Sequence, residues 1–160
     1  MQVFDASSMI YAWDNYPINQ FPGMWEWMAT QIEEQRLVML NVAFEEVTNK
    51  TPECGKWLEE NNITQLETTN EILQEALRIK KLLGIDGDKY HAKGVGENDL
   101  FIIATARVHK AGLVSDEKRQ NALLKEPTKR KIPAVCAMKE VNVLCINFLE
   151  FIKRSDEVFR

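Results

Sequence analysis

Short apolar segments alternate with longer helical stretches along almost all of the 160 residues. Apolar runs without polar alternation are typical of strands whose sheet is covered on both faces. Such runs occur at residues 2–5, 37–40, 113–115 and 141–147. Strands that are separated by helices form parallel sheets, and right-handed crossovers place helices on both faces. We therefore predict an α/β fold with three layers, α/β/α, around a parallel sheet of four to five strands.

Helical spacing of apolar residues, together with start and stop signals, indicates where the intervening helices lie. The clearest helix covers residues 70–83, in which Ile72, Ala76 and Ile79 share one face and Gly84 follows the last turn. Further helices are predicted at about residues 9–13, 24–34, 42–50, 52–61, 99–111, 132–140 and 148–155. Three of them are expected to be capped by side chains, which are Ser7 or Ser8, Asn41, and Asn98.

The composition is that of one globular domain, which we assign to residues 1–160. No apolar run approaches the roughly 20 residues that cross a membrane, and the first residues lack a basic segment followed by an apolar one. Three cysteines without C-x-x-C spacing are typical of reduced thiols in the core, so a cytoplasmic location is predicted. A net charge of −4 excludes nucleic-acid binding through bulk charge alone.

Basic residues are nevertheless clustered, and the most compact cluster contains Lys125, Lys129, Arg130 and Lys131. Clusters of this kind are usually solvated surface. The alternative is a rim that faces phosphate beside an acidic centre, and we carry this forward as a hypothesis.

Acidic residues lie where the predicted strands end, or in the helices beside them. In open parallel sheets, ligands collect at the carboxyl ends of the strands, so these acids are expected to converge on one edge. They are Asp5, Glu45, Glu46, Asp99, Asp116 and Glu117. Taken singly, an acid at a helix start is explained by free N–H groups and the helix dipole. Several carboxylates packed together repel, so some must stay protonated or a cation must neutralise them.

A cation held by these acids would have oxygen ligands only, because neither histidine nor cysteine accompanies them. Such a ligand set favours Mg²⁺ or Mn²⁺ over zinc. Magnesium usually keeps several waters and bridges to a substrate phosphate. The predicted chemistry is therefore phosphodiester hydrolysis by a metal-activated water.

Four short segments carry these acids: VFDASS (3–8), FEEV (44–47), NDLFIIATA (98–106) and LVSDE (113–117). In this order and at these distances they resemble the PIN domain, a family of metal-dependent nucleases that includes the VapC toxins of toxin–antitoxin pairs. The tail KIPAVCAMKEVNVLCINFLEFIKR (131–154) also resembles a PIN subfamily of uncharacterised function, in which an Ile-Pro-x-x-Cys segment precedes the last strand. The resemblance covers nearly the whole chain and implies a PIN-like fold.

The resemblance implies a role for each matching residue. Asp5 matches the first metal-binding acid, and Ser7 matches the small hydroxyl residue that orients this acid or a metal-bound water. Glu46 matches the second acid, with Glu45 as the alternative, and Asp99 matches the third.

The fourth acid is open between two neighbouring residues. The family pattern is threonine or serine, any residue, then an acid, which places Glu117 in register after Ser115. Asp116 takes that place if the strand ends one residue earlier.

The site predicts a Mg²⁺- or Mn²⁺-dependent endoribonuclease whose substrate is RNA. By resemblance, one expected role is the toxin of a type II toxin–antitoxin pair, which would form a homodimer and bind an antitoxin protein. Trp25, Trp27 and Met28 are expected in the core or in that dimer interface. The alternative is a non-catalytic module that binds nucleic acid or protein on the same scaffold. A nucleotide-binding enzyme is disfavoured, because no G-x-G-x-x-G or Walker-type loop follows the first strand.

Overall fold

The computed structural model describes residues 1–120 and 124–160, and within them the chain builds one five-stranded parallel sheet. The strands lie in the order β3-β2-β1-β4-β5. Their bounds are β1 Gln2–Phe4, β2 Leu37–Leu40, β3 Gln65–Leu66, β4 Gly112–Val114 and β5 Cys145–Ile146. The predicted α/β class and the parallel sheet are confirmed.

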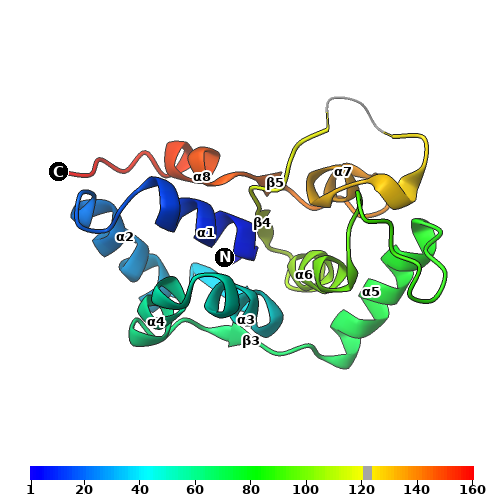
Figure 1. Cartoon of the computed structure of the whole chain (residues 1–160), viewed down its shortest axis with the longest axis horizontal. Helices are drawn as coiled ribbons and strands as arrows, with labels where there is room; N and C mark the ends of the chain where they lie inside the picture. Colours follow the sequence, from blue (N-terminus) through cyan, green and yellow to red (C-terminus); the bar gives the residue numbers. More distant parts are fainter. Residues whose placement is uncertain (121–123) are drawn as a thin grey trace.

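Helices cover both faces of this sheet, which gives the three predicted layers. Figure 1 shows α1, α2, α4 and α8 on one side of the strands and α5, α6 and α7 on the other. The helices are α1 Ala6–Asn15, α2 Pro22–Glu33, α3 Asn41–Lys50, α4 Pro52–Glu60, α5 Asn70–Leu82, α6 Glu97–Val108, α7 Ile132–Ala137 and α8 Phe148–Ser155. A short 3-10 helix, η1, spans Pro127–Lys129. Because α3 follows β2 without a loop, it packs against α1 and α4 at the carboxyl end of that strand.

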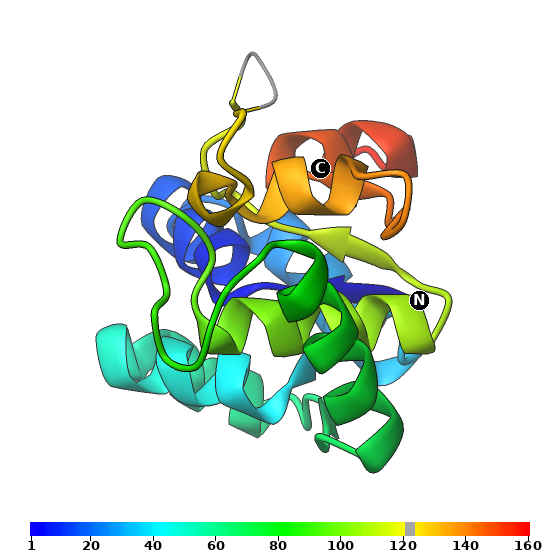
Figure 2. The ribbon, with the colours of Figure 1, turned by 90° about the vertical axis from the view of Figure 1, so that its right-hand side faces the viewer.

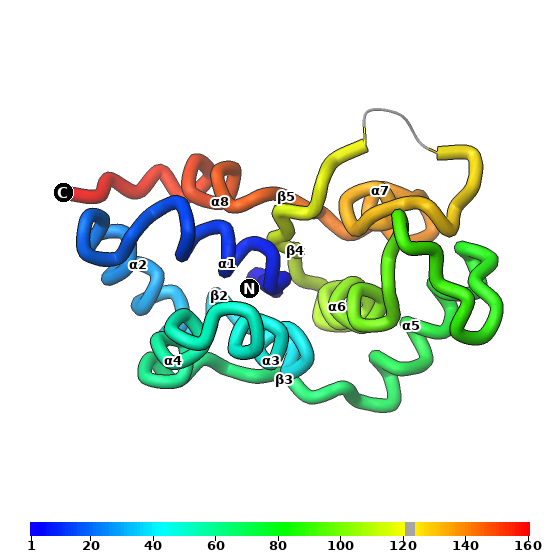
Figure 3. The backbone as a smooth tube through the Cα atoms, viewed as in Figure 1, coloured from blue at the N-terminus to red at the C-terminus, as the bar shows by residue number. Residues whose placement is uncertain are grey.

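The central strand β1 lies between β2 and β4, with Val3 opposite Val38 on one side and Leu113 on the other. These side chains are buried, as expected for strands that helices cover on both faces. The strand order reverses at β1, because the chain builds outward through β2 to β3 and then crosses back to β4. Figure 3 shows β5 and β3 at opposite edges of the sheet, with the N-terminal strand between them. The carboxyl ends of β1 and β4 are therefore the switch point at which ligand sites form.

Two strands differ from the sequence-based expectation. The strand β3 was not predicted, because two residues with one partly buried leucine carry no apolar run. Of the predicted strand 141–147, only Cys145–Ile146 forms a strand, β5, which pairs with β4. Val141 and Val143 account for the longer prediction, since both are buried without belonging to the strand.

The predicted side-chain caps were wrong at three helices. Ser7 and Ser8 lie inside α1, whose N-cap residue is Asp5. Asn41 is the first residue of α3. Asn98 lies in the first turn of α6, and the N-cap there is Gly96. The helices α1 and α3 begin earlier than the polar residues suggested, because β1 and β2 run into them with almost no loop, whereas α6 begins at Glu97 after the loop that follows α5.

Aromatic side chains form a continuous cluster inside the chain. The ring of Trp25 contacts the rings of Trp13 and Trp57 edge to face, with centroids 5.3 Å and 4.8 Å away. Its Nε1 donates a hydrogen bond of 2.7 Å to the carbonyl oxygen of Tyr16. Trp25 and Met28 are buried, so the core alternative holds for these two. Trp27 is only partly buried, and its place in a dimer interface stays a prediction.

Two of the three cysteines are buried, as expected for thiols in the core. Cys54, Cys136 and Cys145 are free thiols, and the first two are buried. Within residues 1–120 and 124–160, no helix is long and apolar enough to cross a membrane.

Two irregular segments lie side by side at the carboxyl edge of the sheet, as Figure 2 shows for the green segment before α6 and the yellow segment after β4. The amide of Val95 donates a hydrogen bond of 3.0 Å to the carbonyl oxygen of Arg130. A Cβ atom added to Gly94 would lie 1.8 Å from the carbonyl oxygen of Thr128. The sequence predicts a charged loop over residues 116–131, of which residues 121–123 lie outside the described residues.

This contact predicts that Gly94→Ala destabilises the chain, because backbone would have to move to admit the methyl group. We expect the free energy of unfolding to fall by about 2–3 kcal/mol in urea denaturation. Gly96→Ala is the matched control, since a Cβ there would meet only Asp99 Oδ2 at 3.8 Å. Equal stability of the two variants would contradict the packing of these segments.

Candidate functional site

Asp5 lies at the carboxyl end of β1 and is 2% exposed. Two hydroxyl groups donate hydrogen bonds to its Oδ2: Ser7 Oγ at 2.6 Å and Ser115 Oγ at 3.0 Å. Ser7 is in the first turn of α1, and Ser115 directly follows β4. The switch point between β1 and β4 therefore holds a buried carboxylate between two serines.

These serines also fix the chain that follows β4. Ser7 Oγ accepts a hydrogen bond of 2.9 Å from the amide of Asp116, and Ser115 Oγ accepts one of 3.2 Å from the amide of Glu117. Ser115 was not among the predicted site residues, although its place in the serine-x-acid pattern was the available signal. The two hydroxyls thus hold the backbone of Asp116 and Glu117 in place after β4.

Burial raises the pKa of Asp5 to about 7, and the charges of Asp99 and Glu117 add to the rise, although the Ser7 and Ser115 hydrogen bonds oppose it. The segment that carries Glu117 is tied to the end of β1, because Ser115 and Ser7 hydrogen-bond both to Asp5 and to the amides of Glu117 and Asp116. Asp99 lies in the first turn of α6. That these acids form one site stays a prediction.

Asp99 is held in the first turn of α6, where its Oδ2 accepts a hydrogen bond of 2.9 Å from the amide of Gly96. Burial raises its pKa, the Gly96 hydrogen bond opposes the rise, and the charges of Glu117 and Glu46 add to it. The charges of Asp99 and Glu117 thus raise the pKa of Asp5, and those of Glu117 and Glu46 raise the pKa of Asp99.

Asp116 and Glu117 point to different places. Asp116 Oδ2 accepts hydrogen bonds from Ser8 Oγ at 2.6 Å and from the amide of Phe148 at 3.2 Å, which ties α1 to the start of α8. The charge of Glu117 contributes to the raised pKa of Asp5. Because the carboxylate of Asp116 is already held by Ser8 and the Phe148 amide, we favour Glu117 as the fourth acid.

The side chains of Glu45 and Glu46 also point in different directions, because consecutive residues lie on different faces of the helix α3. Glu45 is exposed, and Glu46 is half-buried on the side that faces Asp99. Glu46 Oε1 forms an ion pair of 2.7 Å with Lys50 Nζ, one turn further along the same helix.

The basic segment 125–131 contributes one ammonium group to this edge. Lys131 Nζ lies 3.9 Å from Glu117 Oε2, and its charge lowers the pKa of Asp99 against the causes that raise it. Lys129 is paired with Glu126 at 3.1 Å, and the Arg130 guanidinium donates to the carbonyl oxygen of Leu124. Of these three residues, we therefore retain Lys131 as the candidate for the phosphate-facing rim.

The carboxylate oxygens of these acids are the ligand type that hard divalent cations prefer, and burial raises the pKa values of Asp5 and Asp99. Their present arrangement is not that of a formed metal centre. Over the part of the chain that the structure describes, no three histidine, cysteine, aspartate or glutamate side chains come close enough to hold a metal ion.

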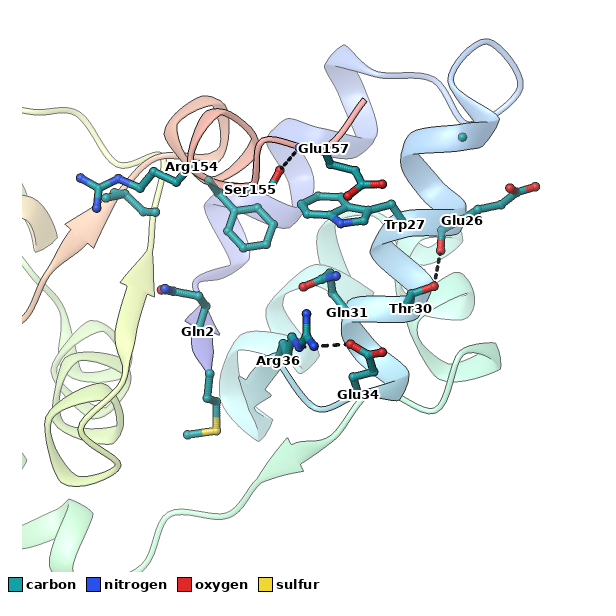
Figure 4. A pocket seen from close by; sticks show the side chains of 14 residues that line it. Gln2, Glu26, Trp27, Thr30, Gln31, Glu34, Arg36, Arg154, Ser155 and Glu157 are labelled. Atoms are coloured by element: carbon teal, nitrogen blue, oxygen red, sulfur yellow. Dashed lines mark hydrogen bonds and ion pairs between the residues drawn. The ribbon is translucent and has the colours of Figure 1, made fainter. Parts of the chain in front are cut away.

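A cavity of about 690 Å³ lies elsewhere, between α2 and α8 near the amino ends of β1 and β2. Figure 4 shows Gln31 reaching into it from α2, beside Trp27 and the Arg36–Glu34 ion pair. Its lining includes none of the predicted site residues. The acid site and this cavity are thus at opposite ends of the sheet.

The raised pKa of Asp5 predicts a pH-dependent cost of folding. Between about pH 4 and pH 7 the unfolded chain loses this proton while the folded chain keeps it, so this group lowers stability as pH rises, and its cost is complete above pH 7. In metal-free buffer, Asp5→Asn should therefore unfold with a free energy close to that of the wild type at pH 4 and higher by up to about 4 kcal/mol at pH 8.

Urea denaturation between pH 4 and pH 8 in the presence of a chelator measures this difference. Asp14→Asn is the matched control, because Asp14 is exposed and its substitution should leave the pH dependence unchanged. A difference between Asp5→Asn and wild type that does not grow with pH would contradict the buried, protonated Asp5.

Comparison with solved structures supports the architecture. The crystal structure of PAE2754 from Pyrobaculum aerophilum matches with a TM-score of 0.57 and 14% sequence identity, covering 96% of this chain and 93% of that chain. At this identity the likeness concerns the fold alone. No curated protein matches the chain. Residues 2–159 match the family described as "Domain of unknown function (DUF4411)", and the chain therefore belongs to that family.

Proposed function

We propose that this protein is a Mg²⁺- or Mn²⁺-dependent endoribonuclease of the PIN type. The observation that carries the proposal is the buried carboxylate of Asp5 at the switch point, with Asp99 and Glu117 close enough to raise its pKa. A fold gains nothing by burying repelling carboxylates unless a cation or a proton compensates them. Perturbed acids at the carboxyl edge of a parallel sheet are candidates for a functional site.

The proposed ligands are Asp5, Glu46, Asp99 and Glu117. A bound divalent ion would supply an activated water and neutralise charge on the phosphate. The chain itself contributes orientation, since Ser7 and Ser115 hold Oδ2 of Asp5 and leave its Oδ1 free of those hydroxyls. Asp116 is outside the proposed ligand set, because Ser8 and the Phe148 amide already hold its carboxylate.

RNA as substrate, a toxin role, an antitoxin partner, a homodimer and a cytoplasmic location remain parts of this proposal that rest on the PIN resemblance. The dimer interface would have to lie outside Trp25 and Met28, because both are buried in the single chain. An antitoxin that covers the acids would compete with a metal and with RNA for the same edge.

A second candidate is a non-catalytic binding module on the same scaffold. The observation that favours it is that Glu46 and Glu117 each lie beside a lysine, at 2.7 Å and 3.9 Å. These lysines compensate part of the negative charge without any metal. The two candidates differ in whether the acid site binds a divalent ion.

The nuclease proposal predicts cleavage of mixed single-stranded RNA in Mn²⁺ and none in chelator. Asp5→Asn, Asp99→Asn and Glu46→Gln should each lower the rate at least about 100-fold, because each removes a negative ligand from the metal. Glu45→Gln is the matched control for Glu46→Gln, and its rate should stay within about twofold of wild type.

Two outcomes would reject the proposal that this protein is a nuclease. Equal cleavage by the wild type and Asp5→Asn would indicate a contaminating nuclease. No cleavage by any of the proteins, with no rise in melting temperature on adding Mn²⁺, would favour the binding module.

The position of Lys131 beside Glu117 predicts a contact with phosphate. Lys131→Ala should weaken RNA binding several-fold at low salt and reduce the slope of log affinity against log salt by about 1. Lys125→Ala, in the same basic segment but exposed, should change both quantities less. The measurement is fluorescence anisotropy with labelled RNA in chelator at several salt concentrations, and equal slopes for both variants would contradict this role.

A further inference from the structure

The cavity between α2 and α8 contains a buried side-chain amide that has no hydrogen-bond partner. The side chain of Gln31, on α2, is 9% exposed and reaches into the cavity (Figure 4). Among the described residues, Trp25 and Thr30 of the same helix donate side-chain hydrogen bonds to carbonyl oxygens, whereas the Gln31 amide makes none. Leaving a buried amide unpaired costs free energy, so a ligand that pairs with it is favoured.

A second amide in the lining of the cavity is also unsatisfied. Gln2 begins β1, and its Oε1 is buried without a hydrogen-bond partner in the part of the chain that the structure describes. This amide packs over Gly112 of β4, where an added Cβ atom would lie 2.4 Å from Gln2 Oε1. Two side-chain amides, one from a helix and one from the central strand, thus have unused hydrogen-bonding capacity beside the cavity.

Aromatic rings line the cavity next to Gln31. Trp27 lies one turn before Gln31 on α2, so the indole and the amide are on the same face of the helix. The Trp27 ring contacts the rings of Phe151 and Phe159, with centroids 5.2 Å and 5.3 Å away, and it remains partly exposed. An indole that is held by two phenyl rings and still accessible provides a surface on which a planar ligand can stack.

The charged side chains of the lining disfavour an anionic ligand. Three carboxylates and two guanidinium groups line the cavity, and they belong to Glu26, Glu34, Glu157, Arg36 and Arg154. Both guanidinium groups already have partners, since Arg36 pairs with Glu34 at 3.1 Å and Arg154 with Glu150 at 3.5 Å. A phosphate or carboxylate in the cavity would therefore meet uncompensated negative charge.

A neutral planar ligand with a donor next to an acceptor meets these requirements. An amide side chain has an oxygen acceptor beside its N–H donors, and it forms paired hydrogen bonds with adenine through the N6 amino group and N7. An organic cation would offer donors only and would leave the N–H groups of Gln31 unpaired. The cavity volume of about 690 Å³ is within the range of small-molecule sites.

We propose that this cavity binds an adenine base, which the Gln31 amide recognises at N6 and N7 and on which the Trp27 indole stacks. Free adenosine and an unpaired adenine in RNA present the same ring and the same edge, so either is a source of the base. The lining contains none of the acids at the carboxyl edge of the sheet. The proposal therefore needs neither a metal nor cleavage at those acids.

The test is a titration of the nitrogen-15-labelled protein with adenosine in chelator, followed by NMR. Adenosine should shift the side-chain amide resonances of Gln31 and the indole resonance of Trp27. Gln31→Met keeps the length of the side chain and removes its hydrogen bonds, and Trp27→Leu removes the ring. We expect each variant to bind adenosine about tenfold more weakly. Melting temperatures establish that both variants fold.

Two controls separate recognition from general effects. Gln74→Met makes the same change at an exposed position of α5, away from the cavity, and should bind adenosine within about twofold of the wild type. The second control is 7-deazaadenosine, which has the N6 amino group and the ring size of adenosine but no N7 acceptor. It should bind the wild type about fivefold or more weakly than adenosine does, and Gln31→Met should remove most of that difference.

Short oligoadenylate and oligouridylate, also titrated in chelator, distinguish the two sources of the base. If Gln31→Met weakens the binding of oligoadenylate and leaves that of oligouridylate unchanged, RNA can supply the adenine. If adenosine binds and oligoadenylate does not shift Gln31, the ligand is the free nucleoside. In either case the site is supported.

Three results would overturn the proposal. The first is that neither adenosine nor oligoadenylate shifts the resonances of Gln31 and Trp27 up to the solubility limit of the ligand. The second is that Gln31→Met binds adenosine as tightly as the wild type does. The third is that 7-deazaadenosine and adenosine bind the wild type equally well, which would reject recognition at N7. None of these results bears on RNA cleavage at the acids, so the two proposals fail independently.

Discussion

The burial of the Asp5 carboxylate between Ser7 and Ser115 is the interaction on which the rest of the carboxyl edge depends. It joins the end of β1, the first turn of α1 and the end of β4 in one hydrogen-bonded unit. A carboxylate in this position is costly, because it has left water and faces other negative charges. Such a cost is tolerated in a fold when the group has a use, and the proposed metal site gives it one.

The scaffold carries Glu46 on α3 and Asp99 near the start of α6. The helix α3 starts directly after β2, so Glu46 is carried to the same edge as Asp5 with little freedom to move. The helix α6 approaches from the other face of the sheet and presents Asp99 from its first turn, where the Gly96 amide holds the carboxylate. Rigid elements, and not long loops, therefore supply three of the four acids, which suits a site that must hold its geometry.

The sequence predicted the layers and the edge on which the acids meet, because buried parallel strands and amphipathic helices have clear patterns of hydrophobicity. The prediction failed where the local sequence pattern was weak, or where the same pattern is compatible with two structures. The two-residue strand β3 carries no apolar run, and the serines of α1 resemble helix caps although they bind Asp5 and Asp116. The choice between Asp116 and Glu117 depends on which way neighbouring side chains turn, and a one-dimensional spacing cannot encode that direction.

The hydrogen bond between Val95 and Arg130 has a mechanical consequence. It fastens the chain just before α6 to the chain just before α7, and the close approach of Gly94 to Thr128 leaves no slack between them. Asp99 and Lys131 follow the contacting residues Val95 and Arg130 by only a few positions, so both side chains are carried by the same pair of packed backbone segments. A ligand that contacts Lys131 would therefore bind beside the start of α6, where Asp99 lies.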